Sequence, residues 1–92
     1  MSAKRLTIAG QVHGVGYRAW MAGEAVRLGV SGWVRNCSDG TVEALVHGDS
    51  AAVEELLRAC RLGPRLAAVA SISEELAEPE PEPGFRVLPS RR

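Results

Sequence analysis

The chain has 92 residues, of which 46% are hydrophobic, and its 11 basic and 11 acidic residues give a formal net charge of zero. This length and composition predict a single folded domain over residues 1–92 and exclude a disordered chain. The zero net charge argues against general attraction to nucleic acids or membrane surfaces. Two cysteines and two histidines form neither a disulfide framework nor a zinc-binding pattern. We expect a cytoplasmic protein, because there is no signal peptide and no apolar run approaching about 18 residues.

The N-terminal part of the chain predicts a strand, a glycine-rich loop and a helix. Alternating residues predict the strand over 6–12, and apolar spacing predicts the helix over 18–28, ending at Gly29. Between them runs the sequence GQVHGVGYR, residues 10–18. Its glycines let the backbone approach a ligand, the following helix N-terminus attracts anions, and Arg18 offers planar donors suited to phosphate. The spacing matches neither a P-loop nor a dinucleotide-binding loop, so a phosphate-binding loop and a turn that binds nothing remain alternatives.

Two further strands, over residues 30–36 and 41–47, are predicted to form an antiparallel hairpin. The turn at residues 37–40 contains an Asp-Gly pair, which suits the positive φ of a hairpin turn. His47 falls on the polar side of its strand and is expected to face solvent. Asn36 either shapes the turn or presents a fixed amide, with one acceptor and two donors, to a ligand.

The second helix has the clearest pattern in the chain. Asp49 or Ser50 is expected to cap it, and Gly63-Pro64 to end it. Its apolar stripe consists of Val53, Leu56, Leu57 and Cys60. Cys60 is therefore expected to be a small core residue and not a reactive thiol.

The C-terminal part is less regular. Residues 66–76 suit either a helix or a strand, the repeated prolines of residues 78–84 predict an exposed loop, and residues 85–88 suggest a short last strand. The order of elements predicts an α+β fold. We expect a split β-α-β sandwich, with a mostly antiparallel sheet and both helices on one face.

Taken together, the loop and the hairpin resemble the acylphosphatase family. One family signature reads Gly-x-Val-Gln-Gly-Val-x-Phe-Arg, and the other reads Gly-Trp-Val-x-Asn-x-x-x-Gly-x-Val. Residues 32–42 match the second signature throughout, and the first is matched at Gly10, Val12, Gly14, Val15 and Arg18. His13 stands where the family usually has glutamine, and Tyr17 where it usually has phenylalanine.

This resemblance implies a ferredoxin-like fold and the hydrolysis of acyl phosphates to a carboxylate and inorganic phosphate. The groups it implies for phosphoryl binding are the Arg18 guanidinium and the backbone N–H groups of His13, Gly14, Val15, Gly16, Tyr17 and Arg18. Asn36 is implied to orient the attacking water, with no metal, other cofactor or covalent enzyme intermediate. His13 keeps its backbone N–H, but an imidazole that titrates near neutrality can change the pH dependence. We expect a monomer whose partners are the acyl phosphate substrate and inorganic phosphate, with no nucleic acid or membrane.

Two alternatives remain at this level. One is a non-catalytic module that binds phosphate or acyl phosphate, like the acylphosphatase-like domain of hydrogenase-maturation carbamoyltransferases. The presence of both Arg18 and Asn36 favours an enzyme. The other is a nucleic-acid-binding domain of the same fold, which needs strand aromatics for base stacking, whereas aromatic residues make up only 4% of this chain.

Overall fold

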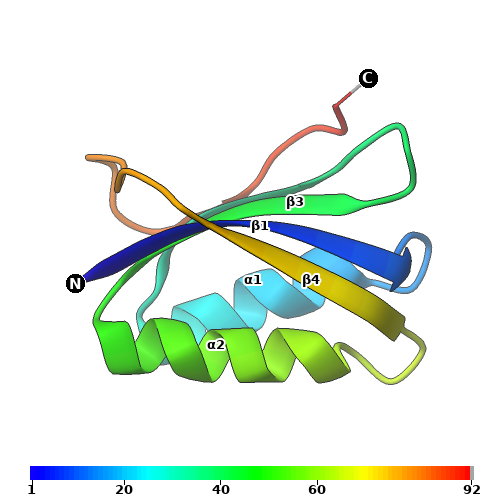
Figure 1. Ribbon diagram of the computed structural model, residues 1–92, viewed down its shortest axis with the longest axis horizontal. Coiled ribbons are helices and arrows are strands. Elements are labelled where there is room, and N and C mark those ends of the chain that lie inside the picture. Colours follow the sequence, from blue (N-terminus) through cyan, green and yellow to red (C-terminus); the bar gives the residue numbers. More distant parts are fainter. Residues whose placement is uncertain (92) are drawn as a thin grey trace.

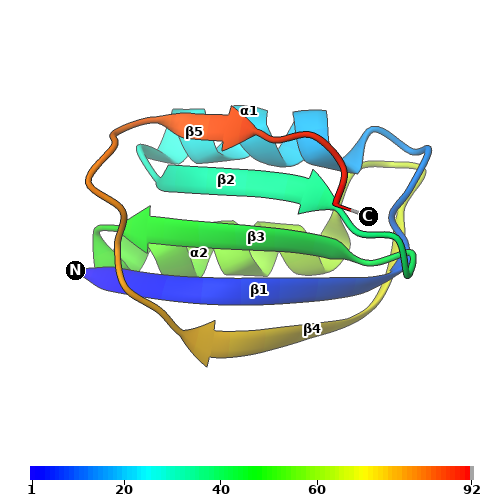
Figure 2. The same cartoon turned by 90° about the horizontal axis from the view of Figure 1, so that it is seen from above.

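A computed structural model describes residues 1–91 and contains a five-stranded sheet with two helices on one of its faces (Figure 1). The elements are β1 (Ser2–Gln11), α1 (Tyr17–Leu28), β2 (Ser31–Asn36), β3 (Val42–Gly48), α2 (Ser50–Leu62), β4 (Ala68–Leu76) and β5 (Phe85–Val87). The strand order is β4-β1-β3-β2-β5, as Figure 2 shows from above. This arrangement confirms the predicted ferredoxin-like α+β fold. No helix in the described chain is long and apolar enough to cross a membrane.

The strand β3 occupies the centre of the sheet and pairs antiparallel with both β1 and β2. The predicted hairpin is confirmed, in a register that runs from Ser31 opposite His47 to Asn36 opposite Val42. Because β1 and β2 are both antiparallel to β3, they run in the same direction. The loop after β1 and the turn after β2 therefore lie at the same end of the sheet (Figure 2).

The core lies between the helices and the sheet. It contains the whole predicted stripe of α2, together with Met21 and Ala25 from α1 and Leu6 and Ile8 from β1. Asp49 caps α2 by accepting a hydrogen bond from the backbone N–H of Ala52. Cys60 is fully buried as expected, and burial raises the pKa of its thiol to about 11, so the reactive thiolate is disfavoured at neutral pH.

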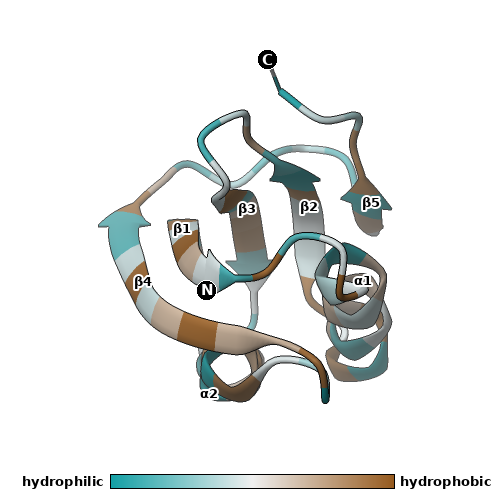
Figure 3. Ribbon diagram, turned by 90° about the vertical axis from the view of Figure 1, so that its right-hand side faces the viewer, coloured by the Kyte–Doolittle hydropathy of each residue, from teal (hydrophilic) through white to brown (hydrophobic). Residues whose placement is uncertain are grey.

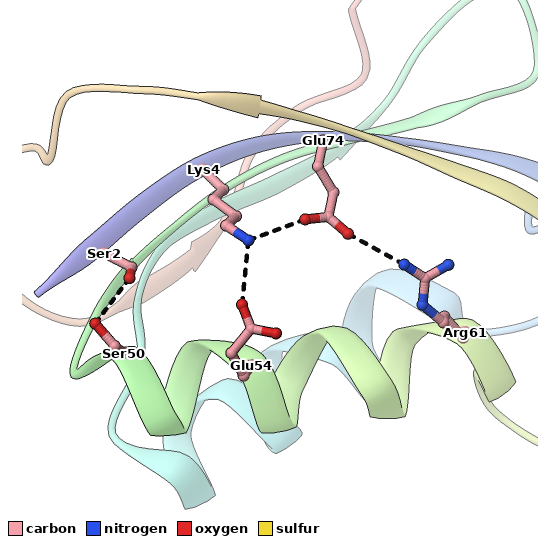
Figure 4. A network of polar contacts seen from close by, with 6 residues as sticks. All are labelled: Ser2, Lys4, Ser50, Glu54, Arg61 and Glu74. Carbon is pink, nitrogen blue, oxygen red and sulfur yellow. Dashed lines mark hydrogen bonds and ion pairs between the residues drawn. The ribbon is translucent and has the colours of Figure 1, made fainter.

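The first strand begins at Ser2, four residues before the predicted start at Leu6. The prediction was wrong because residues 2–5 lack an alternating apolar pattern, although their backbone pairs with β3 and, from Lys4 onward, with β4. Lys4 faces the helices, and its Nζ lies 3.1 Å from Glu54 on α2 and 3.0 Å from Glu74 on β4 (Figure 4). Arg61 of α2 contacts the other oxygen of Glu74, so this polar network connects the edge strand to the helix beneath it.

Residues 66–76, which suited both a helix and a strand, contain the edge strand β4. Val69 and Ile72 of this strand pack against the core. In Figure 3 the ribbon of β4 carries hydrophobic (brown) bands and becomes hydrophilic (teal) toward its tip. The proline-rich residues 78–84 form the predicted loop, which contains no helix or strand.

His47 is buried, with 4% of its surface exposed, which contradicts the expectation that it faces solvent. All six residues from Val42 to His47 are buried, because β3 is central and both of its faces are covered. On the face away from the helices, long side chains provide the cover. Arg5 and Arg35 lie over the Trp33 ring, 5.7 Å and 4.7 Å from its centroid.

Glu43 lies between these two arginines, and both donate hydrogen bonds to it at 2.9 Å. Burial by itself would raise the pKa of Glu43, but the hydrogen bonds from Arg35 and Arg5 outweigh this effect and lower it. A carboxylate whose pKa is lowered by folding stabilises the protein at any pH above its pKa in the unfolded chain. This contribution is lost as the pH falls through its pKa in the folded protein.

We expect Glu43→Gln to lower the free energy of unfolding by about 1–3 kcal/mol at pH 7, because it removes a charge hydrogen-bonded to two arginines. The difference from the parent protein should shrink as the pH falls below 4.5, the ordinary pKa of this group, because Glu43 is then protonated first in the unfolded parent and, at lower pH, in the folded parent. Urea unfolding at pH 7 and at pH 3 measures both effects. Glu78→Gln, at an exposed position in the loop after β4 with no ion pair among residues 1–91, is the control. A pH-independent difference would contradict the ionic role of Glu43.

Candidate active site

The glycine-rich loop and the hairpin meet around a cavity of about 230 Å³ at one end of the sheet. Its lining consists of Val12, Gly14, Gly16, Tyr17, Arg18, Ala19, Asn36 and Val87. Arg18 and Asn36, which the sequence places on separate elements, thus share one cavity. The walls come from the loop, the first turn of α1 and the ends of β2 and β5.

The loop backbone is shaped by two glycines in the left-handed region. Gly14 has φ 71° and Gly16 has φ 77°, values that other residues rarely adopt. Gly16 is also the N-cap of α1, and no side chain accepts a hydrogen bond from the first-turn N–H groups there. By contrast, α2 has the Asp49 carboxylate at its N-terminus. The N-terminus of α1 therefore directs uncapped N–H groups and the positive end of its dipole toward the cavity, an arrangement that suits an anion.

Arg18 follows this N-cap and lies partly buried in the first turn of α1. Among residues 1–91 its guanidinium has neither a salt bridge nor a side-chain hydrogen bond, unlike Arg5, Arg27 and Arg35. A permanent positive charge with five donors is thus available to the cavity.

Asn36 ends β2 and is held from its backbone. It lies opposite Val42 in the hairpin, and its backbone carbonyl accepts a hydrogen bond at 2.8 Å from the N–H of Arg91. Its side-chain Oδ1 is buried and has no partner among the described residues. A buried amide oxygen without a partner is costly, so this group is suited to hold a polar ligand or a water molecule.

The remaining loop residues of the predicted site lie in different places. His13 is exposed and lines a neighbouring cavity of about 340 Å³, together with Asn36 and the hairpin turn. Val15 packs against the hydrophobic core. Asp39 accepts hydrogen bonds from the side chain and the N–H of Thr41, which lower the pKa of its carboxyl group, so it has the turn-forming role expected of it.

Sequence reasoning missed the contribution of the C-terminal segment. Val87 lines the first cavity, and Ser90 and Arg91 line the second. These residues reach the site because β5 pairs parallel with β2 and the chain continues alongside Asn36. No motif marks them, and only the pairing of two strands far apart in the sequence brings them there.

Tyr17 is buried below the loop, and its hydroxyl donates a hydrogen bond at 2.7 Å to the backbone carbonyl of Cys60. The helical partner of that carbonyl would be the residue four positions later, which is Pro64 and has no N–H. The tyrosine hydroxyl therefore satisfies a carbonyl that α2 leaves unpaired at its C-terminal end. Burial raises the pKa of Tyr17, so the hydroxyl keeps its hydrogen and remains a donor.

Fold and cavity together define a class: a small α+β protein of the ferredoxin-like fold with an anion-binding loop at a helix N-terminus. No group of three His, Cys, Asp or Glu side chains within residues 1–91 is arranged to hold a metal ion. The family model for acylphosphatase matches residues 4–87. The chain belongs to the acylphosphatase family of enzymes.

Individual relatives agree with this assignment. An acylphosphatase from Acidiphilium cryptum is 62% identical over 92% of this chain and 93% of its own length. The crystal structure of acylphosphatase from Bacillus subtilis matches with a TM-score of 0.92 and 31% identity, over 96% of this chain and 99% of that one. A domain within full-length HypF matches 98% of this chain with a TM-score of 0.90 and 25% identity, but this covers only 12% of HypF.

We expect Tyr17→Phe to lower the free energy of unfolding by about 1–2 kcal/mol, because the Cys60 carbonyl loses its donor while the ring remains in place. Urea unfolding followed by tryptophan fluorescence measures this loss. Binding of inorganic phosphate should be unchanged, because the backbone of the loop does not depend on the hydroxyl. A variant as stable as the parent would show that the hydrogen bond contributes nothing.

Proposed function

We propose that this chain hydrolyses acyl phosphates to a carboxylate and inorganic phosphate at the cavity between the loop and the hairpin. One observation carries the proposal. Within residues 1–91, the Arg18 guanidinium and the buried Asn36 amide oxygen both lack a partner, and they border the same cavity at a helix N-terminus that no side chain caps. Each is a group that a phosphoryl substrate and a water molecule would satisfy.

In this proposal the phosphoryl group binds first through its charge. The backbone N–H groups of residues 13–18 donate hydrogen bonds to its oxygens, and the Arg18 guanidinium provides charge-assisted donors in a planar fork. The cavity is small, so it admits the phosphoryl group and leaves the acyl part toward solvent. Recognition would then depend little on the acyl group.

Asn36 then orients a water molecule, which attacks phosphorus opposite the leaving carboxylate. The new bond joins the water oxygen to phosphorus, and the bond between phosphorus and the acyl oxygen breaks with its electron pair on that oxygen. A dianionic acyl phosphate and water thereby give a carboxylate and dihydrogen phosphate, so atoms and charge balance. No general acid is required, because a carboxylate is already a stable leaving group.

The proposed enzyme needs no cofactor, since phosphoryl transfer is accelerated mainly by positioning and by stabilisation of charge on the equatorial oxygens. Arg18 and the N–H groups supply that stabilisation from fixed positions. We also propose that it acts as a cytoplasmic monomer. The two free cysteines are compatible with a reducing compartment.

Asn36→Ala should lower kcat for benzoyl phosphate by about 10²–10³, because the attacking water loses the group that orients it. Affinity for inorganic phosphate should stay within about threefold of the parent value, since the amide is not the main phosphate ligand. Steady-state kinetics with a chelator present, and calorimetric titration with phosphate, measure the two quantities. Parental turnover by this variant would contradict the role of Asn36 and favour an enzyme with another water-binding group.

Arg18→Ala should weaken phosphate binding by about 10-fold to 100-fold and abolish most turnover, because charge-assisted hydrogen bonds to the phosphoryl oxygens are lost. Arg27→Ala is the matched control. It lies at the other end of α1 and pairs with Glu24, so phosphate binding and turnover should be unchanged. If Arg18→Ala bound phosphate as the parent does, the phosphate would have to bind elsewhere. A parent protein that binds phosphate but turns over no acyl phosphate would be a binding module.

A further inference from the structure

The loop and the hairpin turn that form the proposed site lie beyond the end of the pairing between β1 and β3. The pairing of β1 with β3 ends where Ile8 lies opposite Val42. The loop residues that follow, 12–16, and the hairpin turn, 37–41, therefore project beyond the last backbone pair. Their relative position must be maintained by something other than the β-ladder.

A side chain provides the connection. The Nε2 atom of His13 lies 2.8 Å from the backbone carbonyl oxygen of Thr41. Because a carbonyl oxygen only accepts hydrogen bonds, Nε2 must carry the hydrogen, as it does in the imidazolium and in one neutral tautomer. Among the hydrogen bonds within residues 1–91, this is the one that joins the loop at 12–16 to the turn at 37–41.

The carbonyl that His13 contacts is close in structure to Asn36. The same Thr41 oxygen accepts a second hydrogen bond, at 2.9 Å, from the N–H of Cys37, which directly follows Asn36. The pairing of Asn36 with Val42 lies one residue further along both strands. A displacement of the Thr41 carbonyl would therefore move the backbone that carries the proposed water-orienting amide.

The other contacts of the loop do not restrain its two glycines. Around Gly14 and Gly16 there is open space, with no atom within 4 Å of where a side chain would begin. Val12, at the start of the loop, is buried in the core, and Val15 between the two glycines packs against it. Both anchors are apolar contacts with the core and neither reaches the hairpin turn, so the segment with two left-handed glycines can shift relative to that turn unless a further contact restrains it.

We propose that His13 is a positioning residue, which holds the phosphate-binding loop and the Asn36 hairpin at the separation required for attack by water. This inference rests on the proposed function, because it assigns His13 a role in that same site. His13 acts through the Thr41 carbonyl and is not itself a phosphate ligand through its side chain. Its effect is therefore on the alignment of water with the bound phosphoryl group, and misalignment of about 1 Å is enough to slow a reaction substantially.

His13→Ala should lower kcat for benzoyl phosphate by about 10-fold to 100-fold and leave the affinity for inorganic phosphate within about threefold of the parent. His13→Gln should recover most of the lost kcat, because its amide N–H can reach the same carbonyl. His13→Phe keeps the ring volume without a donor and should behave like the alanine variant. Because the side chain is exposed, none of these substitutions disturbs the core.

A double-mutant cycle with Asn36→Ala tests whether His13 acts through Asn36. In the Asn36→Ala background, His13→Ala should reduce kcat by less than about twofold further, since there is no longer an oriented water to misalign. Fully additive effects, with Asn36→Ala itself strongly impaired, would overturn the inference and leave the proposed function intact. If Asn36→Ala retained parental turnover, the water-orienting role would fail and the inference with it.

Two other results would overturn the inference. Parental kcat in His13→Ala would show that the hydrogen bond has no role in alignment. A loss of phosphate affinity as large as the loss of kcat would show that the imidazole binds the phosphoryl group directly.

Discussion

The site depends on the pairing of β1 and β2 with opposite edges of β3. Both strands then run in one direction and end at the same edge of the molecule, although a helix and its two connections separate them in the sequence. The split β-α-β order makes this possible, because the crossover through α1 leaves room for β3 between them. A register shift of β3 against β1 or β2 would therefore separate the loop from Asn36, even if the loop and the hairpin turn kept their own conformations.

The two helices illustrate how satisfied and unsatisfied backbone groups are distributed in this fold. At α2 the polar groups are paired within the protein: Asp49 caps its start, and the Tyr17 hydroxyl serves the carbonyl that Pro64 leaves without a partner near its end. The start of α1 has no such cap, and the nearby Arg18 has no acidic partner among residues 1–91. Unpaired backbone groups at helix ends thus have two uses here. At α2 they are paired within the protein and stabilise the fold, and at the start of α1 they remain available to a ligand.

The sheet face opposite the helices has its own polar interior. Glu43, flanked by Arg5 and Arg35, and Trp33 beneath the two guanidinium groups cover the central strand where no helix does. This arrangement lets a sheet in a small protein bury both faces of its middle strand. Neither Arg18 nor Asn36 takes part in this network, but Arg91, whose N–H binds the Asn36 carbonyl, reaches it with a guanidinium nitrogen 3.7 Å from Glu43.

Periodicity and turn chemistry in the sequence were sufficient for both helices, the hairpin and the fold, because apolar spacing and Asp-Gly or Gly-Pro signals act locally. They left the roles of Arg18 and Asn36 open, and the resemblance of the two motifs to the acylphosphatase family made both of them candidate site residues. Local patterns could not reveal that residues 2–5 extend β1, or that His47 is buried, because both depend on which strands lie alongside. For the same reason, only the tertiary structure placed Val87 against the cavity and His13 against the Thr41 carbonyl. Contacts between residues far apart in the chain are decided by strand order and register, which no single stretch of sequence encodes.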